Sequence, residues 1–272
     1  MGGHLRHHRH RGQAVRSSAP RPSLQPGQAA LDLRSPELYS PAPDAAAVIP
    51  LKDDNPIRTV PFVTVSIIAV NVAVFVRGLF LPQATQQALL MRLALIPHDL
   101  TQPVAGRPDL LAYNLLTLLT SMFVHGGWLH LLGNMLYLWI FGNNIEDVLG
   151  HARYLLFYLL CGLSGAAAQI AADPASRVPM IGASGAIAGV LGAYLVTFPA
   201  ARVSTLIFVL FFARLVEVPA LIVLGFWLLI QLMNAGRSGP AGVAWFAHLG
   251  GFLAGLLLVV LLRRRRVPHS LY

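Results

Sequence analysis

The chain has 272 residues, of which 56% are hydrophobic and only 11% are charged, and its mean hydropathy is +0.63. A soluble domain has about 25% charged residues, so this composition excludes an ordinary soluble protein and predicts a helical membrane protein. The net charge of +9 comes partly from the Arg-rich N-terminal segment and partly from Arg263–Arg266. No aromatic or folded basic module accompanies this charge, so we expect no nucleic-acid partner and interpret it as the basic ends of a membrane protein.

Residues 1–58 are rich in Pro, Ala, Arg and Ser and show little hydrophobic periodicity. We therefore expect a disordered, basic, cytoplasmic tail. Its stretch HLRHHRHRG is interpreted as a solvated segment facing anionic lipid, and metal binding by its imidazoles is the alternative. The charges are not followed by an apolar run, so no signal peptide is expected. Residues 1–31 contain no acidic residue, as in a transit peptide, which leaves an organellar inner membrane as the alternative to a bacterial plasma membrane.

Six apolar runs approach the roughly 20 residues that a helix needs to cross a bilayer. They are residues 61–81, 128–147, 154–172, 182–199, 217–234 and 243–262. The stretch 110–124 is short and favours a re-entrant or interfacial segment. The stretch 203–213 either extends a neighbouring span or lies at the interface. The predicted fold is all-α, a six-transmembrane-helix bundle over residues 59–263, followed by a basic cytoplasmic tail at 264–272.

The basic ends predict the orientation of the bundle. If the N-terminal tail and Arg263–Arg266 are both cytoplasmic, the number of spans must be even, and six satisfies this. The second, fourth and sixth runs then descend from the outer face. They bring His130 with Asn134, Ser184, and His248 to one depth below that face. Polar residues at such a depth are costly and usually line a cavity or pair with one another.

These polar residues predict acyl-transfer chemistry. A serine hydroxyl becomes a nucleophile when a neutral histidine accepts its proton, so Ser184 and His248 form a candidate catalytic dyad. No carboxylate lies near them in the sequence. Candidate donors to an oxyanion are the His130 ring, the Asn134 side-chain amide and the Ser184 backbone N–H at the start of its helix.

Glycines surround the candidate nucleophile and recur on the sixth run. Small residues let transmembrane helices approach closely, and a short serine–histidine contact between two helices requires such an approach. The residues expected to support the site in this way are Gly182, Gly185, Gly251 and Gly255, with Gly189 and Gly192 on the same helix as the serine.

Three stretches together resemble the rhomboid family of intramembrane serine proteases, of the bacterial six-helix type. They are HGGWLHLLGNMLYLWIFGNNIEDVLG, GASGAIAGVLGAY and AHLGGFLAG, in this order. The resemblance covers about residues 60–262. It implies cleavage of single-span membrane proteins, within the lipid bilayer and near the outer surface, without a metal ion, ATP or another cofactor. It also makes residues 110–124 part of a partly submerged first loop.

The resemblance implies a role for each site residue. Ser184 is the nucleophile, His248 is the general base, and His130 and Asn134 form the oxyanion site with the Ser184 amide. The sequence departs from the family at two points. It has no Trp-Arg pair between residues 82 and 127, and Ala188 stands where some members have a tyrosine that stacks on the histidine. The anchoring of the first loop and the orientation of the histidine are therefore left open.

Several alternatives fit parts of this pattern. His125 and His130 could ligate a metal, but their spacing of five without an intervening acid does not match a helical zinc hydrolase, so no metal is expected and His125 is interpreted as a structural or cavity-lining residue. Glu146 is expected to pair with Arg153 or another loop group. A non-catalytic relative that binds membrane helices would be expected to lack Ser184 or His248. A cation transporter usually places ionisable residues near the bilayer midplane, where this chain has almost none.

Overall fold

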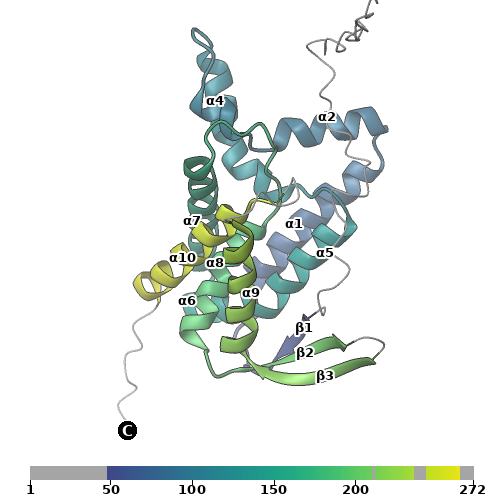
Figure 1. Cartoon of the computed structure of the whole chain (residues 1–272), viewed down its shortest axis with the longest axis vertical. Coiled ribbons are helices and arrows are strands. Elements are labelled where there is room, and N and C mark those ends of the chain that lie inside the picture. Colours follow the sequence, from purple (N-terminus) through teal and green to yellow (C-terminus); the bar gives the residue numbers. More distant parts are fainter. Residues whose placement is uncertain (1–47, 210–211, 236–242, 264–272) are drawn as a thin grey trace, which may run out of the picture. The chain divides into compact units, whose positions relative to one another are not determined.

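The computed structural model describes residues 48–209, 212–235 and 243–263, which form a mainly helical structure with one small sheet (Figure 1). The N-terminal segment up to residue 47 and the segment 264–272 lie outside the described residues. The expectations of a disordered N-terminal tail and of a cytoplasmic C-terminal tail therefore stay predictions for these segments.

The helices follow one another along the chain with short connections. The bounds are α1 (Phe62–Leu79), α2 (Gln83–Leu93), α3 (Pro97–Thr101), α4 (Pro108–Thr120), α5 (Trp128–Tyr137), α6 (Asn143–Leu149), α7 (His151–Ala172), α8 (Ser184–Thr197), α9 (Ala220–Ala235) and α10 (Trp245–Leu262). A 3₁₀ turn, η2 (Ser121–Phe123), follows α4. A π-helical turn, η3 (Leu138–Gly142), joins α5 to α6 as one continuous helical stretch. Each of the six apolar runs expected to span the membrane contains a helix.

Length and composition qualify only some of these helices as membrane spans. Among the described residues, α1, α7 and α10 have at least 18 residues and sufficient hydropathy. A fourth span is possible where α4–η2 meets α5–α6, two stretches that are bent by 79° at their junction. Helices α8 and α9 are apolar but have only 14 and 16 residues. The chain therefore forms a helical membrane bundle, and the exact number of six spans stays a prediction.

Helix α8 lies at the centre of the bundle. All of its residues from Ala186 to Tyr194 are buried, and α7 and α10 both pack against it. Glycines allow the close contact with α10, because a methyl group on Gly251 or Gly255 would overlap a carbonyl oxygen of α8. Helices need such small residues for close approach in a membrane, where lipid is as apolar as the side chains.

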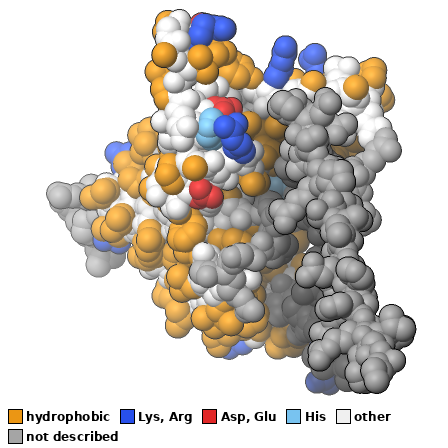
Figure 2. Space-filling view, turned by 45° about the horizontal axis from the view of Figure 1, so that its top comes forward, with side chains coloured by type: hydrophobic (Ala, Val, Ile, Leu, Met, Phe, Trp, Pro, Cys, Tyr) orange, Lys and Arg blue, Asp and Glu red, His pale blue; other side chains and the backbone are white. Residues whose placement is uncertain are grey.

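Apolar side chains also cover much of the outside of the bundle. Large hydrophobic residues are exposed on α1, α9 and α10, including Leu257 and Leu261, which are 68% and 76% exposed. Figure 2 shows a broad hydrophobic flank on the face drawn, with few charged side chains. An exposed apolar surface of this extent marks contact with a membrane or a partner rather than with water.

A three-stranded antiparallel sheet corrects the expectation of an all-α fold. Its strands are β1 (Val48–Asp53), β2 (Arg202–Val209) and β3 (Phe212–Pro219), in the order β1-β2-β3. The stretch 203–213, expected to be helical or interfacial, thus lies mostly in strands, because it is rich in β-branched residues that favour an extended backbone. The boundary expected at residue 59 is also too late, since β1 precedes it.

A buried carboxylate fastens the start of α1. Glu146 is fully buried and accepts hydrogen bonds from the backbone N–H groups of Val63 and Thr64, at 2.8 and 2.7 Å, and from the Thr64 hydroxyl at 2.7 Å. It also lies 2.6 Å from His151 Nδ1. The pairing expected with Arg153 or another loop group is thus made by His151 and not by Arg153, and the N–H groups of the helix start satisfy the rest of the carboxylate. Arg153 instead donates to the carbonyl of Leu262.

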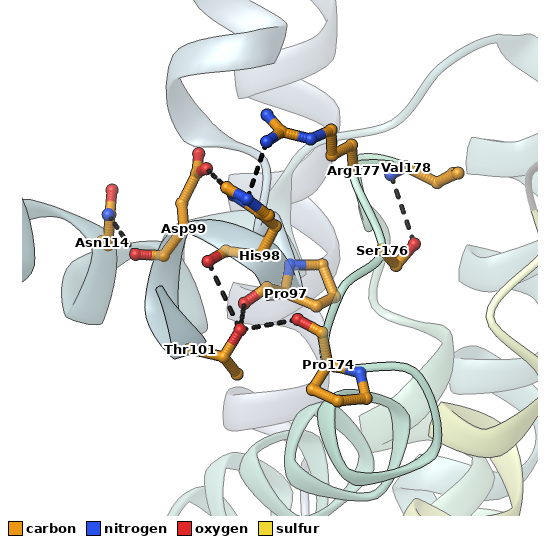
Figure 3. Close-up of polar contacts among 9 residues, drawn as sticks. All are labelled: Pro97, His98, Asp99, Thr101, Asn114, Pro174, Ser176, Arg177 and Val178. Atoms are coloured by element: carbon orange, nitrogen blue, oxygen red, sulfur yellow. Dashed lines mark hydrogen bonds and ion pairs between the residues drawn. The ribbon is translucent and has the colours of Figure 1, made fainter. Parts of the chain in front are cut away.

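The segment between α1 and α5 holds the loop that leads into α8. Leu95 and Met180 exchange backbone hydrogen bonds of 3.0 and 2.8 Å, and the N–H of His98 donates to Ser176 O at 3.0 Å. Figure 3 shows the side chains that reinforce this contact. The Thr101 hydroxyl donates to the carbonyl of Pro174 at 2.6 Å. These bonds anchor the loop at a place where the sequence offered no Trp-Arg pair.

A charged cluster completes the same contact. Arg177 Nη2 lies 2.7 Å from His98 Nε2, and His98 Nδ1 lies 3.2 Å from an Asp99 carboxylate oxygen (Figure 3). The guanidinium can only donate, so His98 accepts from it through Nε2 and donates to Asp99 through Nδ1. The carbonyl of Asp99 in turn accepts from the side-chain amide of Asn114 on α4. The loop before α8 is thus tied to both α3 and α4.

Candidate active site

Ser184 is the first residue of α8, and the turn before it fixes its position. Gly182 has a φ of +108°, a left-handed conformation that L-residues with a side chain rarely adopt. Its N–H donates to the carbonyl of Ser121 at 2.9 Å. A methyl group on Gly182 would also lie only 2.5 Å from His130 Nε2. Gly182 therefore serves both the backbone turn and the close approach of His130.

The structure brings Ser184 and His248 together. The Ser184 Oγ lies 2.8 Å from His248 Nε2, although 64 residues separate the two in the sequence. His248 lies in the first turn of α10, and the tight packing of α8 against α10 brings the two helix starts side by side. Both side chains are only partly buried, so the pair can be reached from outside the bundle.

His248 has a second polar partner that the sequence analysis did not identify. Its Nδ1 lies 2.7 Å from Oε1 of Gln231, a residue of α9 that is only 5% exposed. The rings of Trp227 and Trp245 flank the imidazole, at centroid distances of 6.0 and 6.2 Å. A polar side chain within the apolar run 217–234 is the signal that would have pointed to Gln231.

The other two predicted site residues lie beside the turn at Gly182 that leads into α8. His130 and Asn134 are one turn apart on α5, as expected from their spacing, and both reach Gly182. The Asn134 Nδ2 lies 2.9 Å from Nε2 of His125, and the rings of His125 and His130 are 4.9 Å apart in an edge-to-face arrangement. His125 thus positions Asn134. Among the described residues, no group of three or more His, Cys, Asp or Glu has the geometry of a metal site.

A small cavity of about 40 Å³ opens beside Ser184. Its walls come from the segment before α5, from α7, from the loop before α8 and from the start of α10. The lining residues are small or apolar and include Met122, Gly162, Ala166 and Ala247. The cavity has room for a small side chain only. The site as a whole combines a hydroxyl with an adjacent imidazole, polar donors across from it and a small apolar recess, an arrangement suited to acyl transfer.

Comparison with known proteins agrees with this geometry. The profile of the Rhomboid domain matches residues 112–265, which include all four polar residues of the site and more than half of the chain. The chain is similar to RHOMBOID-like protein 5 of Arabidopsis thaliana (34% identity over 54% of this chain) and to Rhomboid protein 1, mitochondrial, of Saccharomyces cerevisiae (29% over 52%). It is also similar to Rhomboid protease GluP of Bacillus subtilis (36% over 52%).

The chain belongs to the rhomboid family, which confirms the resemblance found in the sequence. The matched regions cover only 44%, 40% and 25% of these three relatives, so the chain spans less than half of their length. One of these relatives is a plant protein, one is a mitochondrial protein of yeast, and one is bacterial.

Proposed function

We propose that this protein is an intramembrane serine endopeptidase that cleaves transmembrane segments of single-span membrane proteins near the outer membrane surface. The observation that carries the proposal is the 2.8 Å contact between Ser184 Oγ and His248 Nε2 in a chain of the rhomboid family. A hydroxyl within hydrogen-bond reach of an imidazole is the arrangement that activates a serine nucleophile.

The reaction begins when Ser184 Oγ attacks the scissile carbonyl carbon and His248 Nε2 takes the hydroxyl proton. The tetrahedral intermediate collapses as His248 returns this proton to the leaving amine, and an acyl ester on Ser184 forms. A water molecule, deprotonated by His248, then hydrolyses the ester and regenerates the serine. Each step moves one proton through the same nitrogen, so the dyad suffices for both halves of the reaction.

The negative oxygen of the intermediate needs donors fixed in advance. The backbone N–H of Ser184 lies in the first turn of α8, where it has no partner within the helix and the helix dipole is positive. The Asn134 amide has two hydrogens, and one of them is left for substrate when the other is donated to His125. The ring of His130 lies beside Gly182, two residues before the nucleophile. These three groups are the proposed oxyanion site.

The sheet supports the proposed topology. Strand β1 precedes α1, and β2 follows α8, yet the two strands are hydrogen-bonded. Both must therefore lie on the same side of the membrane, which requires an even number of spans between them. Helix α1, the α5–α6 stretch, α7 and α8 make four, and α4 is then a loop helix. The basic ends make this side the cytoplasm, and the membrane is that of a bacterium, or alternatively of an organelle.

The shortness of α8 supports a buried site. Its 14 residues extend about 21 Å at 1.5 Å per residue, whereas the hydrocarbon core is about 30 Å thick. If its far end, which leads to β2, lies at the cytoplasmic surface, Ser184 lies below the outer surface. Substrate helices must unwind there, and the polar residues of the site replace the hydrogen bonds that the substrate backbone loses.

The test uses purified protein and a panel of single-span membrane proteins. We expect Ser184→Ala and His248→Ala each to abolish cleavage and labelling by a fluorophosphonate, while thermal unfolding shows that both variants fold. Ser204→Ala, which alters a serine on β2, is the matched control and should cleave and label as the wild type does. Cleavage that persists in Ser184→Ala would overturn the proposal.

A further inference from the structure

We propose that Gln231 is a positioning residue that holds the catalytic histidine in one tautomer and one ring orientation. The inference rests on the proposed function, because it assigns the role of general base to His248. Gln231 lies on α9, and its Oε1 is 2.7 Å from His248 Nδ1, on the side of the ring opposite to Ser184.

Trp227, Gln231, His248 and Ser184 form a row of three hydrogen bonds, and the carbonyl of Trp227 at one end fixes the direction of each bond. Gln231 Nε2 lies 3.1 Å from the carbonyl oxygen of Trp227, and a carbonyl oxygen can only accept. The amide nitrogen therefore faces Trp227, and the amide oxygen faces His248. Because this oxygen also can only accept, His248 must carry its proton on Nδ1.

This tautomer is the one that the reaction needs. With the proton on Nδ1, Nε2 has a free lone pair directed at the Ser184 hydroxyl, which donates to it. The opposite tautomer would place a hydrogen between Nε2 and Ser184 Oγ, and the histidine could not act as a base. The backbone carbonyl of Trp227 thus orients the Gln231 amide, and the amide oxygen sets the tautomer of His248. His248 in that tautomer accepts the hydrogen bond from the Ser184 hydroxyl.

The surroundings of Gln231 keep this arrangement in place. Its side chain is 5% exposed, and the bond to Trp227 lies within one turn of the same helix. An amide flip would place its oxygen against the Trp227 carbonyl oxygen and leave the Gln231 oxygen without a donor in a buried site, which is costly. Gln231 thereby supplies the orienting contact that Ala188, a buried methyl group, cannot supply.

A neutral amide also suits the location of the site. In soluble serine proteases an aspartate orients the histidine and stabilises the imidazolium ion that forms during the reaction. A carboxylate within a membrane bundle is expensive in its resting state. The amide oxygen of Gln231 still accepts from Nδ1 when His248 becomes charged, and a hydrogen bond to a charged group is stronger than one to a neutral group.

The direct test is ¹⁵N NMR of the imidazoles in the wild-type protein, with the His248 signals assigned by their loss in His248→Ala. We expect Nδ1 protonated and Nε2 unprotonated near neutral pH. An Nε2-protonated His248 ring in the wild-type protein would overturn the inference. This readout does not depend on proteolysis, so it stands apart from failure of the proposed function, which the Ser184→Ala experiment detects.

Variants give the functional test. We expect Gln231→Leu to lower kcat roughly 10–100-fold with little change in KM, the size of one lost hydrogen bond to a charged group. Its His248 ring should show a mixture of tautomers. Asn234→Leu is the matched control, because Asn234 lies on the same helix and, within the described part of the chain, its side chain donates to the carbonyl of Ile230. This control should retain the wild-type kcat and the wild-type ring signals.

Gln231→Glu separates positioning from mere packing. It has the same length and keeps an acceptor opposite Nδ1, so it should fold and recover most of the activity lost in Gln231→Leu. Its negative charge favours the imidazolium, so the acid limb of the pH–rate profile should move to higher pH. Wild-type kcat, pH profile and ring signals in both Gln231 variants would overturn the inference.

Discussion

The side-chain nitrogen of Asn134 carries two hydrogens, and its contact with His125 uses one of them. This Nδ2 lies 2.9 Å from His125 Nε2, and it borders the turn at Gly182 that leads to the nucleophile. A second hydrogen on the same nitrogen can point toward the place where negative charge develops. The contact with His125 limits the rotation of the amide, and such preorganisation is the main source of oxyanion stabilisation.

We therefore expect Asn134→Ala to lower kcat by roughly 10²–10³-fold, about 2.7–4 kcal/mol, with a smaller effect on KM. Steady-state cleavage of a detergent-solubilised substrate measures this change. Asn234→Ala, which removes an amide on α9 that donates to the carbonyl of Ile230, serves as the control. If Asn134→Ala turned over substrate at the wild-type rate, this residue would not belong to the oxyanion site.

The cavity beside Ser184 predicts which residue precedes the cut. Its volume of about 40 Å³ and its lining of Gly, Ala and Met side chains accept a small side chain and exclude a large one. Replacing Ala by Phe at this position of a cleaved substrate should lower kcat/KM by at least tenfold, because overpacking costs about 1–3 kcal/mol. Equal cleavage of the two substrates would show that the cavity does not receive this side chain.

At the scale of residues, the sequence predicted the four polar groups but not their supports. Ser184, His130, Asn134 and His248 were found from helical spacing and depth. Their supports, His125 and Gln231, were missed or read as structural. Each support acts through a contact between two different elements. His125 precedes α5, which carries Asn134, and Gln231 lies on α9, next to the helix that carries His248. Spacing within one helix carries no information about such contacts.

The contact between α8 and α10 depends on specific glycines rather than on glycines in general. A methyl group on Gly251 would overlap the carbonyl of Gly185, and the backbone there cannot give way as a side chain can. A methyl group on Gly185 itself would lie 3.6 Å from the Ala247 carbonyl oxygen, an ordinary van der Waals distance. The two glycines face each other, yet only one of them has no room for a side chain.

We expect Gly251→Ala to lower the free energy of unfolding by about 1–3 kcal/mol, the usual cost of overpacking. Gly185→Ala is the matched variant and should be neutral or slightly stabilising, since alanine favours a helix by about 1 kcal/mol over glycine. Thermal unfolding in detergent measures both. A loss in Gly185→Ala equal to that in Gly251→Ala would contradict this account of the packing.

Strand β1 is attached to the helices through one buried carboxylate. The hydroxyl of Tyr194 on α8 and the amide of Asn144 on α6 both donate to the same oxygen of Asp53, each at 2.7 Å. Burial raises the pKa of Asp53 above its usual value, and the hydrogen bonds from Tyr194 and Asn55 oppose that shift. The protonated form is thus favoured on folding, so the contribution of Asp53 to stability falls as pH rises from the unfolded to the folded pKa.

Asp53→Leu should lower the free energy of unfolding by about 1–3 kcal/mol, because it leaves the buried Tyr194 hydroxyl without its acceptor and removes one acceptor of the Asn144 amide, which also donates to Ile140 O and Asn143 Oδ1. Asp53→Asn retains one oxygen in the same place and should lose less. Unfolding of the three proteins at one neutral pH gives the comparison. If the leucine variant were as stable as the asparagine variant, the donors would have found other partners and β1 would not be fastened here.

For the molecule as a whole, the orientation in the membrane can be tested at two exposed positions. Val178 lies in the loop before α8, and Leu215 lies on β3. A membrane-impermeant maleimide should label Val178→Cys in intact cells, and it should label Leu215→Cys only after the membrane is opened. The native Cys161 is buried and provides the unlabelled background. Labelling in the reverse order would place Ser184 at the wrong face.

The proposed position of the site below the membrane surface predicts a preference for substrates whose helix is easily unwound. Gly and Pro weaken a helix by about 1 and 3 kcal/mol relative to Ala. Replacing these residues by Leu in a cleaved transmembrane segment, with the cut-site residue unchanged, should slow cleavage several-fold. Rates that stay equal or rise across several such substrates would mean that the enzyme does not select for an unstable helix.

The sequence by itself determined the class of the molecule and predicted the chemistry that is proposed for its site. Apolar runs of membrane length and three motifs in order predict a rhomboid, and polar residues stand out in such runs because they are costly in lipid. Apolar character alone did not predict the structure of residues 203–213, an apolar stretch that lies mostly in strands. Hydropathy records burial in apolar surroundings, and it does not distinguish a span from a sheet that pairs with a distant strand.

Only the tertiary structure decided how the site is held. Three contacts between different elements hold it. They are the pairing of β1 with β2, the hydrogen bonds between the first loop and residues 174–180, and the contact of Gln231 with His248. Each depends on the distance and direction between two atoms, and a one-dimensional pattern of residue types contains neither quantity. The sequence therefore predicted which groups would react, whereas the packing of α8, α9 and α10 decided the distances at which they meet.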